Sequence, residues 1–61
     1  MKKVLIVEDD KEISNLLEIH LTDLNCNIKK CYDGLSGLNS AKTESFDLIV
    51  LDIMLLIPVE S

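Results

Sequence analysis

Residues 4–10 read VLIVEDD, a short apolar run that leads directly into three acids. A continuous run of branched aliphatic residues is typical of a strand that is covered on both faces. We therefore predict a strand over Lys3–Val7 that ends at the acids. Although two lysines precede it, the run is too short for a membrane span or for the apolar region of a signal peptide. A cytoplasmic protein is the default expectation.

A helical pattern follows the acids. Between residues 11 and 24 the apolar side chains fall at helical spacing, which predicts an amphipathic helix. The apolar positions are Ile13, Leu16, Leu17, Leu21 and Leu24. Asp9 or Asp10 can cap the helix, and Asp9 with Glu12 resembles a capping box. Asn25 stands where a left-handed residue commonly follows a helix.

The second half of the chain repeats this alternation. We predict a strand over Asn27–Cys31 and then, after a turn at Asp33-Gly34, a short helix that runs up to about Thr43. Its apolar residues repeat at three-residue spacing as Leu35, Leu38 and Ala41. Gly37 weakens this helix but permits close packing. Residues 48–51 read LIVL and predict a third strand, buried in the core, which again ends in an acid, Asp52.

The order strand, helix, strand, helix, strand predicts an α/β fold with right-handed parallel crossovers. If the first strand lies in the middle, the three-stranded parallel sheet has the order 2-1-3. Glu8, Asp9 and Asp52 then converge at one edge, where open α/β sheets hold ligands. Two charges about 4 Å apart repel by about 4 kcal/mol at an effective dielectric near 20, and a magnesium ion would relieve that repulsion. The alternative is that these strand ends carry solvated acids.

The composition excludes several other kinds of site. The net charge is −5 and the cations are all lysine, so we do not expect the chain to bind nucleic acid. Cys26 and Cys31 form no zinc or redox motif, and we expect both to be buried free thiols. His20 stands alone on the first helix and is expected to be structural or solvated.

Three segments together resemble the receiver domains of transcription-factor-type response regulators in two-component signalling. They are VEDD at residues 7–10, Asp33-Gly34, and FDLIVLDIML at residues 46–55. Each segment is a weak signal, but their order and separation are specific. The resemblance implies the first half of a receiver over residues 1–55, with a truncated flavodoxin-like β-α-β-α-β fold, and a divergent tail over residues 56–61.

The resemblance also implies a role for each acid. Asp52 would be the phosphoacceptor, taking a phosphoryl group from a phosphohistidine on a histidine kinase. Asp9 and Asp52 would bind Mg²⁺ through their carboxylates, Glu8 through a bound water, and Met54 through its backbone carbonyl. Such a domain is not an enzyme in the ordinary sense, because it catalyses little beyond its own phosphorylation.

The tail departs from the family. Receivers have a proline where Leu56 stands, and two further strand-helix units that supply a hydroxyl and a lysine for the phosphoryl oxygens. Loss of one such donor often costs about 3 kcal/mol, so we expect slow phosphorylation. An exposed edge on the third strand predicts a homodimer that extends the sheet from residues 48–57. The alternatives are a non-phosphorylatable dimerising or strand-adding module, a fragment without a cellular function, and an aspartyl hydrolase that would use Glu8-Asp9-Asp10.

Overall fold

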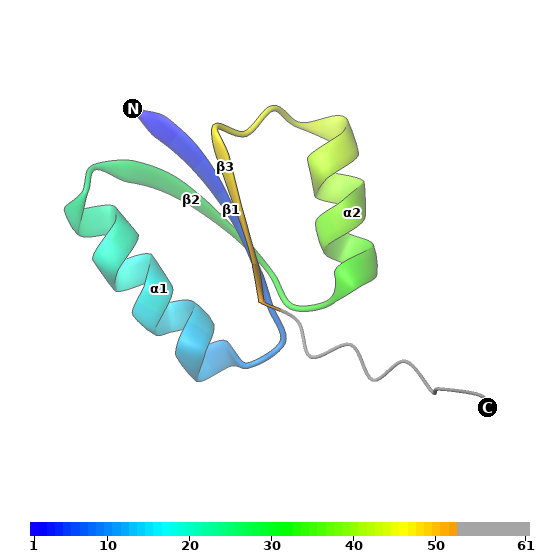
Figure 1. Ribbon diagram of the computed structural model, residues 1–61, viewed down its shortest axis with the longest axis horizontal. Coiled ribbons are helices and arrows are strands. Elements are labelled where there is room, and N and C mark those ends of the chain that lie inside the picture. The colour runs from blue at the N-terminus through cyan, green and yellow to red at the C-terminus, as the bar shows by residue number, and fades with distance from the viewer. Residues whose placement is uncertain (53–61) are drawn as a thin grey trace.

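The computed structural model describes residues 1–52, in which strands and helices alternate as predicted. The elements are β1 (Lys2–Glu8), α1 (Lys11–Asp23), β2 (Cys26–Cys31), α2 (Gly34–Thr43) and β3 (Leu48–Asp52). The three strands are parallel in the order β2-β1-β3, and α1 and α2 lie on opposite sides of the sheet (Figure 1). The predicted fold class and strand order are therefore confirmed. Neither helix in this range is long and apolar enough to cross a membrane.

β1 forms the centre of the sheet. Its residues 2–7 pair with β2, and its residues 4–8 pair with β3. All four residues of Val4–Val7 are at most 2% exposed, which confirms that this strand is covered on both faces. Side chains alternate between the faces of a strand. Leu5 and Val7 join a cluster with Cys31 that Ala41 of α2 and Phe46 complete, so their face of the sheet is the one that α2 covers.

β3 is less buried than the sequence predicted. Leu48, Ile49 and Leu51 are 51%, 46% and 70% exposed, so the prediction that residues 48–51 lie in the core is wrong within the described part of the chain. The reason is that β3 pairs there with β1 alone and leaves its other edge open. Asp47 anchors the start of this strand, because it accepts from the Lys3 amide through Oδ2 (2.8 Å) and donates to the Lys3 carbonyl (2.7 Å).

The first helix begins at a side-chain cap. Asp10 Oδ1 accepts from the backbone N–H groups of Glu12 (2.9 Å) and Ile13 (3.3 Å). The capping box suggested for Asp9 is therefore wrong, because the cap lies one residue later and Glu12 then occupies the second helical position. The predicted left-handed residue after the helix is confirmed, since Asn25 has φ 63°.

The helices bury small residues against the sheet. Ser14 is the buried residue of α1, and Gly37 and Ser40 are the buried residues of α2. Five of the eight apolar residues of the two predicted stripes are exposed: Ile13, Leu16, Leu24, Leu35 and Leu38. The other three, Leu17, Leu21 and Ala41, are partly buried. A Cβ on Gly37 would lie 2.6 Å from both γ-carbons of Val7, so this glycine sets how closely α2 approaches β1, as the sequence predicted.

The remaining sequence expectations concern single residues. Asp33 caps α2 by accepting from the Ser36 amide (2.7 Å), and this hydrogen bond, with a second from the Ser36 hydroxyl, lowers the pKa of Asp33. Cys31 is buried as expected, 3.5 Å from the Ser40 hydroxyl. Cys26 is only partly buried because it opens the edge strand β2, so that expectation is wrong.

Candidate functional site

Four carboxylates line one cavity at the carboxyl ends of β1 and β3. The cavity has a volume of about 510 Å³, and its lining residues are Glu8, Asp9, Asp10, Ile13 and Asp52. Glu8 and Asp52 are direct neighbours in the parallel register of the two strands. Parallel strands end at the same edge of a sheet, which is why acids 44 residues apart in sequence meet here.

The loop between β1 and α1 supplies the other two acids. Asp9 and Asp10 are both exposed, and the chain enters α1 directly after them. Asp10 and Ile13 line the cavity but were not predicted as residues of the cation site, and as a site residue Asp10 was named only in the hydrolase alternative. The signal for them was present, because a cap and the first turn of its helix must lie beside the strand end that precedes them.

Glu8 is the buried member of the group. Its residue is 3% exposed, and its Oε1 atom accepts from the backbone N–H of Asp10 at 3.0 Å. Its Oε2 atom is buried and has no hydrogen-bond partner within residues 1–52. Buried polar atoms nearly always have a partner, so an orphaned carboxylate oxygen beside an open cavity calls for an explanation.

The surroundings of Glu8 also disturb its protonation. The Asp10 amide, the largest single influence, lowers the pKa of Glu8 by stabilising the charged form. Burial, the adjacent Asp9 and the negative charge of Asp52 act in the opposite direction, and together they raise the pKa above its usual value. The raised pKa of Glu8 shows that its negative charge is disfavoured beside the other acids of the cavity.

Three lysines of the described chain pair with acids outside the cavity. Lys3 and Lys29 both pair with Glu44 (3.1 Å for Lys3 Nζ to Glu44 Oε1), and Lys30 pairs with Glu18 at 2.8 Å. These are the ion pairs found within residues 1–52, and none includes an acid of the cavity. No lysine of residues 1–52 is among the residues that line the cavity.

The donor set fits a hard divalent cation. The cavity offers carboxylate oxygens, which Mg²⁺ prefers. Among the described residues Glu8 Oε2 has no hydrogen-bond partner, and a cation or its bound water would supply one. Within residues 1–52, however, no group of three or more acidic, histidine or cysteine side chains is arranged so that it could hold a metal ion. The acids of the cavity therefore do not form a complete metal site by themselves. Met54, the fourth expected ligand, lies outside the described residues.

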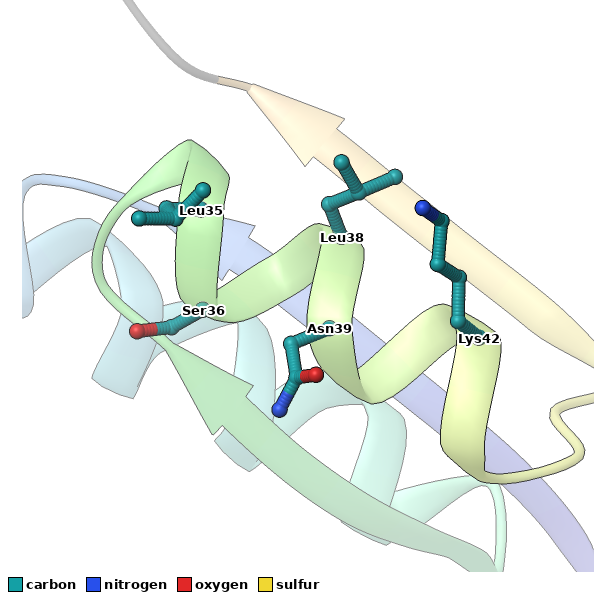
Figure 2. Close-up of a pocket in the computed structure, with 5 residues that line it drawn as sticks. All are labelled: Leu35, Ser36, Leu38, Asn39 and Lys42. Atoms are coloured by element: carbon teal, nitrogen blue, oxygen red, sulfur yellow. The ribbon is translucent and has the colours of Figure 1, made fainter.

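Two other cavities lack this chemistry. One of about 420 Å³ is lined by side chains of α2 alone, and Figure 2 shows them spread along the helix: Leu35, Ser36, Leu38, Asn39 and Lys42. The other, of about 370 Å³, is an apolar groove between α2 and β3 that includes Leu38, Ile49 and Leu51. Neither is lined by a carboxylate, so the acidic cavity is the candidate site.

The chain belongs to the family of response regulator receiver domains, whose model matches residues 4–56. It is 46% identical over 55 residues to "Response regulator ArlR" of Staphylococcus aureus strain Mu50, and equally to the proteins of that name in strains MW2 and USA300. Each alignment covers 90% of this chain and 25% of the relative. The chain therefore spans about a quarter of the length of these curated relatives. No solved structure matches it.

Membership agrees with the resemblance found in the sequence and gives the acidic cavity a context. Histidine kinases generally phosphorylate domains of this family, and receiver domains generally bind Mg²⁺ at the phosphorylation site. The acidic cavity lies inside the matched range, at the strand ends where α/β folds bind ligands.

Proposed function

We propose that this chain is a phosphoacceptor that receives a phosphoryl group on Asp52 from the phosphohistidine of a histidine kinase. The observation that carries the proposal is the pairing of Asp52 with Glu8, a buried acid with one oxygen that has no partner within residues 1–52. Asp52 itself is exposed at the end of β3, where a phosphodonor can reach its carboxylate. Asp52 therefore combines access for a donor with a neighbour suited to a cation.

The transfer follows from the chemistry of the two groups. A carboxylate oxygen of Asp52 attacks the phosphorus and forms a new P–O bond. The P–N bond of the phosphohistidine breaks, and its electron pair stays on the imidazole nitrogen. The product is an aspartyl phosphate on this chain and a free histidine on the kinase. We propose that the chain is a substrate in this exchange and not an enzyme with turnover.

The acids around Asp52 would serve the cation. Asp9 and Asp52 would hold Mg²⁺ through their carboxylates, Glu8 through a bound water and Met54 through its backbone carbonyl. When bound, Mg²⁺ would offset the charge of the acids and of the incoming phosphoryl group.

The free thiols of Cys26 and Cys31 support a cytoplasmic location, where cysteines stay reduced. The net charge of −5 argues against binding of this chain to nucleic acid or to an anionic membrane surface.

A mass measurement tests the proposal. We expect incubation with Mg²⁺ and phosphoramidate, a small donor with a P–N bond, to add a single phosphoryl group to the intact chain. Asp52→Asn should add none. Asp47→Asn is the matched control, because it neutralises an exposed aspartate that precedes β3, at the end of the strand opposite Asp52, and it should be modified like the wild type. Equal modification of Asp52→Asn, or no modification of the wild type, would refute the proposal.

Within residues 1–52 β3 pairs with β1 alone, and this open edge favours a second candidate function, that of a dimerising module. We propose that two copies pair through β3 in antiparallel fashion, so that each Asp52 lies opposite the first residue of the other β3 and the two acids stay apart. The supporting observation is an edge strand with three apolar residues that are about half exposed or more.

Sedimentation tests this dimer. We expect the wild type and Asp52→Asn to sediment as dimers at high micromolar concentration, and Ile49→Lys to be monomeric, because a lysine on an edge strand opposes pairing. Leu35→Lys places the same charge on an exposed apolar residue of α2 and should leave the dimer intact. A monomeric wild type would contradict the second candidate function and leave the first unaffected.

A further inference from the structure

Asp10 is exposed, yet its side chain and its backbone N–H and carbonyl groups are all hydrogen-bonded. Its Oδ1 atom accepts from the Glu12 and Ile13 amides, and its carbonyl accepts from the Ser14 amide at 2.9 Å. Its own N–H donates to Glu8 Oε1 at 3.0 Å. The side chain of Asp10 therefore fixes the backbone that in turn fixes Glu8.

The hydrogen bond from the Asp10 amide also determines the position of the other oxygen of Glu8. With Oε1 held by the Asp10 amide, Oε2 is the oxygen left over, and within residues 1–52 it is buried without a partner. Because Glu8 is 3% exposed, solvent does not compensate for a wrong orientation of this carboxylate. The direction of Oε2 depends on the Asp10 N–H, and the position of that N–H depends on the cap.

We propose that Asp10 is a positioning residue for the cation site: its side-chain cap, and not its charge, holds Glu8 Oε2 ready for a divalent cation or the water bound to it. This inference rests on the proposed function, since it concerns the same cavity. Asp10 touches neither cation nor phosphoryl group in this role. It acts through Glu8, as groups hydrogen-bonded to metal ligands commonly do.

The charge and the cap of Asp10 are separable. Asparagine is as good a helix cap as aspartate, so Asp10→Asn keeps an acceptor at the same position and removes the negative charge. Asp10→Ala removes both. The charge of Asp10 lies at a helix N-terminus, whose positive end already offsets part of it. We therefore expect the loss of the acceptor to matter more than the loss of the charge.

Binding of Mn²⁺, followed by water-proton relaxation, provides a readout that does not depend on phosphorylation. We expect Asp10→Ala to weaken Mn²⁺ binding at least about tenfold, the range found when a group that orients a ligand is removed. Asp10→Asn should remain within about threefold of the wild type. Asp33→Ala is the matched control: it removes the cap of α2 at a residue that does not line the cavity, and it should bind Mn²⁺ like the wild type.

The possible results are distinct. Wild-type affinity in Asp10→Ala, or equal weakening in Asp10→Asn and Asp10→Ala, would overturn the inference and leave the proposed phosphoacceptor intact. A wild type that binds no Mn²⁺ would overturn both the inference and the proposed cation site. If circular dichroism shows that Asp10→Ala is unfolded, Asp10→Ser and Asp10→Gly give the same comparison, because glycine is tolerated at an N-cap but offers no acceptor.

Discussion

Leu5→Ala is expected to unfold the chain. Leu5 is fully buried in the central strand and belongs to the cluster that joins β1, β2 and α2. Truncating a buried leucine to alanine typically costs about 2–5 kcal/mol, through lost burial and the cavity that remains. A chain of this size buries only about 60% of its unfolded surface, so a loss of that size is comparable with its whole stability. Urea denaturation followed by far-ultraviolet circular dichroism measures the effect.

The control for Leu5 is a leucine outside the core. Leu35 is 80% exposed on α2, and Leu35→Ala should shift the urea midpoint little, because alanine is also the better helix former. Equal midpoints for wild type and Leu5→Ala would contradict the described core. Equal losses for the two variants would contradict the outward placement of Leu35.

Gly37→Ala should destabilise the chain by about 1–3 kcal/mol, the usual cost of forcing an extra methyl group into a packed interface. In an exposed helix the same change would stabilise by about 1 kcal/mol, because alanine is the better helix former. Here the new methyl group would lie 2.6 Å from two atoms of Val7, whose strand is paired on both sides. Either α2 must move away from the sheet or β1 must shift.

The informative result is whether Gly37→Ala raises or lowers the melting temperature. Thermal denaturation of Gly37→Ala beside Asn39→Ala compares two alanines in the same helix, one facing Val7 and one exposed. We expect Gly37→Ala to melt below the wild type and Asn39→Ala to melt at or above it. A Gly37→Ala variant that melts above the wild type would show that α2 does not pack on β1 as described.

The sequence was sufficient to predict the elements and their order. Each strand and helix lies within about one residue of its predicted bounds, because apolar runs, caps and the Asn25 terminator are local signals. The predicted order β2-β1-β3 depended on placing β1 in the middle of the sheet, which the structure confirms; right-handed crossovers alone do not fix that order.

Burial was harder to predict, because it depends on which elements cover each face. Residues 48–51 are as apolar as Val4–Val7, yet β1 has a strand on each side and β3 has one on a single side within the described chain. The apolar stripes of the helices gave a wrong prediction of burial for a different reason. A helix packs closest where its side chains are small, as at Ser14 and Gly37, and the sequence pattern gives no weight to that.

The candidate site was predictable in its location and not in its detail. Acids at the ends of parallel strands must share an edge, which placed Glu8 and Asp52 together in advance. The burial of Glu8 and its hydrogen bond from the Asp10 amide depend on the conformation of one side chain and of the loop. The predicted role of Met54 and the predicted tail over residues 56–61 lie outside the described residues.

Chemical mapping of the phosphoryl group tests the central claim most directly. Borohydride reduces an aspartyl phosphate to homoserine, so peptide sequencing by mass spectrometry after treatment with donor, Mg²⁺ and borohydride marks the acid that was modified. We predict homoserine at position 52 and unchanged aspartate at positions 9 and 10. Homoserine at position 9 or 10, or none at position 52, would contradict the assignment of Asp52 as the phosphoacceptor.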